Sequence, residues 1–345
     1  MSVGRLSTLA FFVSTLPAFA DVPDVVTDIP PVHGLVARVM QGVGEPVLLL
    51  DKGASPHDYA LRPSNAAALQ DAELVIWTGE GLAPWLAETI GSVAPNALSL
   101  PLANLEQTVR LPFREGATFE AHDHDHGHEH EDGHEDEDHH DDEHAHDDEH
   151  GHDDHVEDHA HDDHDEDSAH DDHAHEGDDP HMWLDPENGK IWLSAIADAL
   201  SKQDPEHADL YAANATAGQA EIDEASARIA AKLAPLSDLH FIVFHDAYHY
   251  FEARFGVEAV GAISMSDAST PSPKRIAEVR DTVDAMDVTC ALSEPQFNAK
   301  LIDTVLGDHV AARAVIDPLG AHLDNDPEFY IELLDHIAEA FVSCQ

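Results

Sequence analysis

The sequence predicts an α/β protein with two Rossmann-like lobes of parallel sheet and helices, joined by a long rigid helix. Short apolar stretches alternate with helical segments in both halves of the 345-residue chain, a pattern typical of parallel α/β architecture. Between the halves, residues 205–233 are rich in alanine and contain no internal proline. At about 1.5 Å per residue, a helix of this length extends roughly 40 Å and can cross a molecule of this size. We therefore expect an N-terminal lobe at 21–202, a linking helix at 203–235 and a C-terminal lobe at 236–345.

The first half is expected to contain three strands, each followed by a helix. Ser64 is expected to cap the second of these helices. His57 lies in the loop after the second strand, at the side of an open α/β sheet where ligands bind. The expected strands are 25–29, 47–50 and 74–77, and the expected helices are 32–40, 65–71 and 83–90.

Residues 115–179 interrupt this lobe with a sequence made almost wholly of histidine, aspartate and glutamate. Residues 120–179 hold 30 of the 70 acidic side chains and 19 of the 29 histidines, with no lysine or arginine. So little apolar surface cannot offset the entropy of ordering, and we expect a disordered loop. Imidazole and carboxylate groups at short, irregular spacings can capture divalent metals at several weak sites. A merely solvated acidic spacer would not account for the histidines.

The second half repeats the alternation of strands and helices after two helices at 185–201 and 205–233. His245, Glu294 and Asp317 each follow an expected strand, so they lie where the two lobes could face one another across a cleft. The expected strands are 241–244, 257–260, 289–292 and 314–316, and the expected helices are 248–255, 273–286, 299–306 and 327–343.

The first twenty residues predict a secretory signal peptide. Arg5 gives a short basic start, residues 9–16 form an apolar run, and Ala18-Phe19-Ala20 matches an A-x-A cleavage site. This apolar run is shorter than the roughly 20 residues that span a bilayer as a helix. The chain is therefore expected to be exported.

Export bears on the two cysteines and on the charge. Because oxidising compartments preserve disulfides, Cys290 and Cys344 are expected to be paired, with two buried thiols as the alternative. The formal net charge is −54, and nothing in the sequence resembles the basic surface that phosphate contacts require. Nucleic acid is therefore not an expected partner.

Three histidines stand in constrained sequence settings and are candidate ligands of one metal ion. His57 follows a proline, His181 stands between Pro180 and Met182-Trp183, and His245 follows an apolar strand. Any one of them alone could be an ordinary hydrogen-bonded histidine. Together, neutral imidazoles commonly fill three of the four tetrahedral positions around zinc. The fourth position is open to Asp317, Glu294 or water.

The chain resembles the periplasmic zinc-binding proteins of ABC importers, which belong to the metal-binding group of solute-binding proteins. This resemblance implies zinc bound between two lobes by His57, His181 and His245, delivery to a membrane permease, and a disulfide between Cys290 and Cys344. The histidine-rich acidic loop is also typical of the zinc members. The residues that carry the resemblance are Gly53-Ala54-Ser55, His57-Asp58-Tyr59, Leu61-Arg62-Pro63-Ser64, His181-Met182-Trp183-Leu184, Pro186-Glu187, Phe244-His245-Asp246-Ala247-Tyr248, Ser293-Glu294-Pro295-Gln296-Phe297 and Asp317-Pro318-Leu319-Gly320.

One position departs from the family pattern. Some relatives have a glutamate immediately before the first histidine as a further ligand, whereas this chain has Pro56 there. In other branches of the family an acidic residue at the position of Asp317 is the fourth ligand. The resemblance therefore implies Asp317 as a candidate for that role.

The expected function is that of a periplasmic, monomeric, high-affinity zinc receptor that delivers Zn²⁺ to an ABC importer, with the loop for metal capture or sensing. Histidine ligands favour zinc over manganese, although copper and nickel fit the same ligands. One alternative is a zinc hydrolase, but the sequence has no H-E-x-x-H motif and ties no general base to the histidines. The other is a periplasmic metal buffer in which the loop is the functional part.

Overall fold

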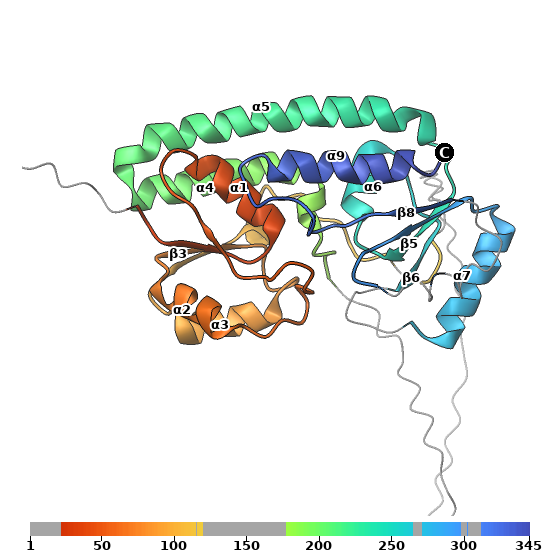
Figure 1. The fold of residues 1–345 in the computed structure, drawn as a ribbon, viewed down its shortest axis with the longest axis horizontal. Coiled ribbons are helices and arrows are strands. Elements are labelled where there is room, and N and C mark those ends of the chain that lie inside the picture. Colours follow the sequence, from red (N-terminus) through yellow and green to blue (C-terminus); the bar gives the residue numbers. More distant parts are fainter. Residues whose placement is uncertain (1–21, 115, 120–176, 265–270, 298–301, 303–311) are drawn as a thin grey trace, which may run out of the picture. The chain divides into compact units, whose positions relative to one another are not determined.

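The computed structural model describes residues 22–114, 116–119, 177–264, 271–297, 302 and 312–345 (Figure 1). The expected signal peptide, residues 120–176 of the expected loop, and the expected helix at 299–306 apart from Ile302 lie outside the described residues.

The first half forms a four-stranded parallel sheet in the order β2-β1-β3-β4. Strands β1 and β3 are buried along their whole length, which is usual for inner strands of a parallel sheet. The helices of this half each have proline in the first turn, where the missing N–H has no intrahelical partner to lose. The elements are β1 (Val25–Thr27), α1 (Pro30–Met40), β2 (Val47–Leu48), α2 (Pro63–Asp71), β3 (Leu74–Trp77), α3 (Pro84–Val93) and β4 (Leu98–Pro101).

The second half forms another four-stranded parallel sheet, in the order β6-β5-β7-β8. In both sheets the strand that comes first in the sequence is second in space, so the two halves repeat one topology. Two parallel sheets with helices confirm the predicted fold class. The elements are β5 (Phe241–His245), α6 (His249–Phe255), β6 (Gly261–Ser264), α7 (Pro273–Ala285), β7 (Cys290–Ser293), β8 (Ala312–Val315) and α9 (Phe329–Val342).

Three details of the predicted elements are wrong. Helix α2 begins at Pro63 after Arg62, and the Ser64 hydroxyl contacts the Asn65 side chain instead of capping the helix. The strand expected at 257–260 is β6 at 261–264, because α6 ends at Phe255, Gly256 follows with a left-handed φ of 67°, and the next residues lead the chain back to the sheet. Strand β4 was not expected, since its side chains are exposed or half-buried and give no apolar run.

Two antiparallel helices connect the sheets. Helix α4 (Pro186–Gln203) is followed by a 3₁₀ turn and then by α5 (Ala208–Leu233), which has 26 residues. Helix α5 packs against α4 and α1 and also against α9 and α6 (Figure 1). It therefore contacts elements of both halves, as expected of a linking helix, and the lobe boundaries at 202 and 236 stay a prediction. No helix in the described part of the chain is long and apolar enough to cross a membrane.

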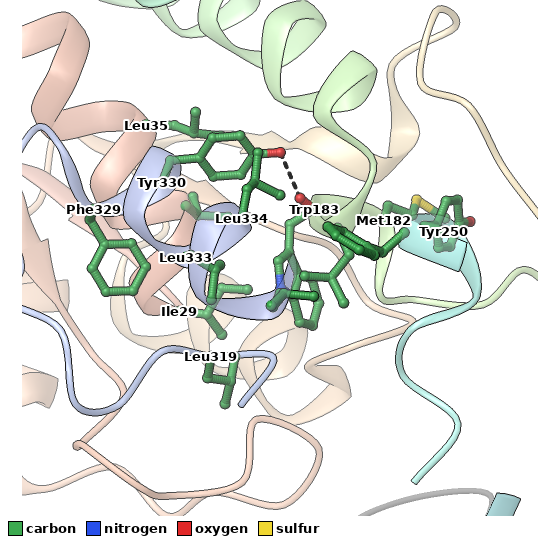
Figure 2. Packing of buried hydrophobic residues seen from close by; sticks show 14 of the residues in the cluster. Ile29, Leu35, Met182, Trp183, Tyr250, Leu319, Phe329, Tyr330, Leu333 and Leu334 are labelled. Atoms are coloured by element: carbon green, nitrogen blue, oxygen red, sulfur yellow. Dashed lines mark hydrogen bonds between the residues drawn. The ribbon is translucent and has the colours of Figure 1, made fainter. Parts of the chain in front are cut away.

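One hydrophobic core contains residues of both halves (Figure 2). Trp183, two residues after His181, is fully buried, and the Tyr330 hydroxyl of α9 donates a hydrogen bond to the Trp183 carbonyl oxygen at 2.7 Å. Helix α4 comes so close that a Cβ on Gly189 would lie 2.6 Å from the Tyr330 oxygen. The segment that carries His181 is therefore fixed by packing on several sides.

The backbone on either side of residues 120–176 is hydrogen-bonded to the folded part of the chain. Thr118 forms an antiparallel bridge with Gly261, and Asp179 donates its N–H to the Leu111 carbonyl at 2.8 Å. A Cβ on Gly261 would lie 2.5 Å from the Ala117 carbonyl oxygen, so this close approach requires glycine. The predicted loop at 115–179 thus includes short ordered stretches at its two ends.

A disulfide joins Cys290 at the start of β7 to Cys344 after α9, with 5.5 Å between the two Cα atoms. It fixes the C-terminal helix to the second sheet, as the cysteine pairing expected from the sequence implies.

Candidate metal centre

The structure brings His57, His181 and His245 together. The ring centroids of His181 and His245 are 4.9 Å apart. The ring centroid of His57 lies 5.4 Å from that of His181 and 6.0 Å from that of His245. One ring nitrogen from each histidine lies within 4.8 Å of the other two. Among the described residues, this is the group of three metal-ligating side chains that comes together.

His57 lies in the loop after β2 and is half-buried, the most accessible of the three ligands. Its own N–H is 3.2 Å from the Ser55 hydroxyl, and the indole N–H of Trp85 donates to the Pro56 carbonyl at 2.8 Å. The bond from Trp85 anchors this loop to α3. The loop therefore holds His57 against the two buried histidines without covering it completely.

His181 is positioned by Asp179. The Oδ1 atom of Asp179 accepts the backbone N–H of His181 at 3.0 Å and lies 2.6 Å from its Nδ1. A proton on Nδ1 leaves the lone pair on Nε2, an atom that is buried and makes no hydrogen bond within the described part of the chain. Burial, and then the neighbouring His245, lower the pKa of His181 well below its usual value. The ring is therefore neutral at neutral pH, the form that binds a metal ion.

His245 is the last residue of β5 and is 2% exposed. Its Nδ1 is 3.4 Å from Oε1 of Glu294, which follows β7 and is 3% exposed. The amide of Gln296 donates to the other oxygen of this carboxylate at 2.6 Å. The two buried histidines thus each have a buried carboxylate beside Nδ1.

Asp317, the candidate for the fourth ligand, makes its hydrogen bonds to the backbone of its own turn. Its two carboxylate oxygens accept backbone N–H groups of the turn that follows, from Leu319 at 3.0 Å and from Ala321 at 2.8 Å. The structure does not bring it into the group formed by the three histidines in the described residues. Its turn instead places Pro318 and Leu319 in the wall of the site.

The space between the rings has a volume of about 10 Å³. It is lined by the three histidines together with Trp183 and Glu294, among others. Such a volume holds a single ion or water molecule. Three imidazoles around a one-ion cavity are a donor set that suits zinc.

Behind the histidines lies a buried network of charges that sequence reasoning missed. The Arg114 guanidinium binds the carboxylate of Asp246, the neighbour of His245. Nη1 of Arg114 also lies 2.6 Å from Oε2 of Glu252. Burial, and then the charge of Asp246, raise the pKa of Asp179 to about 7. The sequence signals for this network were Arg114, just before the acidic loop, and Asp179, two residues before His181. The contacts of these two residues depend on the tertiary fold.

The profile of one protein family, described as zinc-uptake complex component A, periplasmic, matches residues 25–344. The chain belongs to this family. Among its relatives, the high-affinity zinc uptake system protein ZnuA of Brucella abortus (strain 2308) is 44% identical over 320 residues, which cover 93% of this chain and 91% of the relative. The ZnuA protein of Paracoccus denitrificans (strain Pd 1222) is 43% identical over 332 residues, which cover 96% and 94% of the two chains.

The fold agrees with solved structures of the family. A crystal structure of ZnuA superimposes with a TM-score of 0.66 at 23% identity, covering 93% of this chain and 99% of the other. Membership in the zinc-uptake family confirms the predictions of a periplasmic zinc-binding component and of a binding protein that is not an enzyme. It also places the chain in a zinc-uptake complex of the ABC type.

Proposed function

We propose that His57, His181 and His245 bind the zinc ion that this periplasmic protein carries, with high affinity. The observation that supports the proposal is the convergence of one nitrogen from each ring within 4.8 Å around a cavity for one ion. Asp179 holds His181 in the tautomer that presents Nε2 to the ion. Glu294 lies beside Nδ1 of His245 and is suited to the same role.

The fourth position falls to water or to Glu294. Glu294 lines the cavity, whereas both oxygens of Asp317 accept backbone N–H groups of their own turn. If Glu294 is a ligand, Glu294→Gln lowers zinc affinity as strongly as the loss of a histidine. If it only orients His245, the loss is about 10- to 100-fold. Asp317→Asn leaves the affinity close to that of the native chain.

A competitive zinc titration against a chromophoric chelator tests the site. His57→Ala, His181→Ala and His245→Ala are each expected to lose more than the roughly 100-fold that outer contacts contribute. His240→Ala is the matched control, because His240 is exposed and its ring contacts the Met286 carbonyl, away from the three histidines. Unchanged tight binding in any one of the three variants would remove that histidine from the site.

The same titration separates a receptor from a metal buffer. A chain that lacks residues 120–176 keeps one tight site if the three histidines are the receptor site, and loses nearly all binding if the loop is the functional part. A hydrolase is not proposed, since the family is one of binding proteins.

The loop is proposed to capture or sense zinc and to pass it to the three histidines. Imidazole and carboxylate ligands carried on the same chain raise the local metal concentration. We also propose that the chain is a monomer and delivers zinc to the membrane permease of the complex, without a nucleic-acid partner. If the chain without residues 120–176 takes zinc from a competing chelator as fast as the full chain does, the loop has no role in capture. Sedimentation of the native protein tests the monomer.

A further inference from the structure

Two histidines that take no part in the three-histidine site lie side by side at the surface. His322 is in the loop between β8 and α9, His336 is in α9, and both are exposed. Their ring centroids are 4.8 Å apart, and Nε2 of His322 lies 3.4 Å from Nδ1 of His336. The two residues are fourteen positions apart, so the pair is produced by the path of the loop back onto the helix.

The separation of the two nitrogens fits one bound metal ion. Two nitrogens that bind the same zinc ion at about 2.0–2.1 Å with a tetrahedral angle are about 3.3–3.4 Å apart. Hydrogen bonds from N–H groups are commonly about 2.7–3.2 Å long, so a direct bond between the rings would be long. Both nitrogens can therefore bind one ion with almost no change in the positions of the rings.

The surroundings favour a cation. Glu332 is exposed and precedes His336 by four residues, which places it on the same face of α9. Asp324 is exposed two residues after His322. Arg228 and Lys232, which contact this part of α9, are paired with Asp335 at 2.9 Å and with Glu339 at 3.5 Å, and Lys52 donates to the carbonyl of Leu323, next to His322, at 2.9 Å. Negative charge next to a pair of imidazoles raises the local concentration of divalent ions.

We propose that His322 and His336 form a second site for a divalent transition metal ion that prefers imidazole ligands, with water in the remaining positions. Zinc and copper are the ions that this ligand type favours. Two exposed ligands in place of three largely buried ones make the site weaker than the three-histidine site, and its ion exchanges readily with solvent. His322 lies three residues after Leu319, a residue of the cavity wall between the three histidines. The two sites are thus joined by one short loop.

The test must distinguish this pair from the histidines of residues 120–176 in the full mature chain. Diethyl pyrocarbonate modifies imidazole nitrogens that have a free lone pair, and peptide mass spectrometry gives the rate at each histidine separately. Rates are measured without zinc and with free zinc raised beyond saturation of the three-histidine site. The native chain is compared with His336→Gln and with the matched surface variant His240→Gln.

In the native chain, zinc is expected to slow modification of both His322 and His336 by at least about fivefold, since a bound nitrogen has no lone pair to react. In His336→Gln the protection of His322 is expected to fall below about twofold, because a single exposed imidazole binds zinc weakly. His240→Gln is expected to leave the protection of His322 unchanged. Equal protection of His322 in the native chain and in His336→Gln, or no protection in the native chain, would overturn the proposal. A zinc peak between the two rings in anomalous difference maps of zinc-soaked crystals would support it independently.

Discussion

Replacing Asp179 tests whether the carboxylate behind His181 contributes to zinc binding. Two N–H groups of His181 converge on Oδ1, the backbone N–H at 3.0 Å and the ring Nδ1 at 2.6 Å. Asp179→Ala removes both contacts and frees the ring to turn or to change tautomer, which corresponds to a 10- to 100-fold rise in the Kd for zinc, or about 1.4–2.7 kcal/mol. Asp179→Asn keeps an oxygen at the position of Oδ1 and loses only the charge, so we expect a rise of no more than about tenfold.

The assay is a competitive zinc titration of the chain without residues 120–176, so that the three-histidine site is observed by itself. Asp178→Ala is the matched control: it removes the same charge one residue earlier, from an exposed side chain whose nearest basic partner, Arg110, is 3.7 Å away. It is expected to stay within about twofold of the native Kd. If Asp179→Ala also stays within twofold while circular dichroism shows a native fold, Asp179 does not orient His181 and the reasoning fails.

Three further predictions concern stability and are measured by urea unfolding of the zinc-free chain. Gly189→Ala places a Cβ within 2.7 Å of three atoms of the buried Tyr330 side chain and is expected to lower the unfolding free energy by about 1–3 kcal/mol. The control is Gly91→Ala, at an exposed position of α3 with nothing within 4 Å, which is expected to raise the unfolding free energy by about 0.5–1 kcal/mol. An unfolding free energy in Gly189→Ala equal to that of the native chain would show that the ring moves aside. Burial raises the pKa of Asp28 from 3.8 to about 6, so its neutral form favours the folded state at low pH and this contribution is lost as the pH rises through 6. Between pH 4.5 and 7.5 the unfolding free energy of the native chain should fall by about 2 kcal/mol relative to Asp28→Asn, and a constant difference would contradict the raised pKa. Cys344→Ser opens a disulfide that closes 54 residues and should cost up to about 4 kcal/mol without altering the Kd for zinc.

The sheets could be predicted because their inner strands are apolar runs. Strands β1, β3, β5 and β7 are buried, and each was expected within two residues of its observed bounds. Edge strand β4 could not be found in this way, since half of its residues are exposed. The strand at 261–264 was displaced in the prediction because Val257 and Val260 are as apolar as the true strand but pack against the core from the loop between α6 and β6.

The three histidines could be predicted because His57 and His245 follow expected strands, where parallel sheets bring loops together, and His181 precedes an expected helix. The contacts that support the three histidines could not be predicted from the sequence. The roles of Asp179 and Arg114 depend on partners that the fold supplies from distant segments, and one acid among many in an acidic stretch gives no signal. The same holds for His322 and His336, whose proximity depends on how the last loop returns to α9.

The packing around His181 indicates that the site is largely formed before zinc arrives. Trp183 and Tyr330 belong to one core shared by both halves, and the Trp183 indole donates to the Pro318 carbonyl at 2.8 Å, next to the cavity wall. A core that interdigitates in this way transmits strain and resists the opening of one half relative to the other. His57 is the half-buried ligand of the three, and its loop too is tied to the second half of the chain, since Lys52 donates to the Leu323 carbonyl at 2.9 Å.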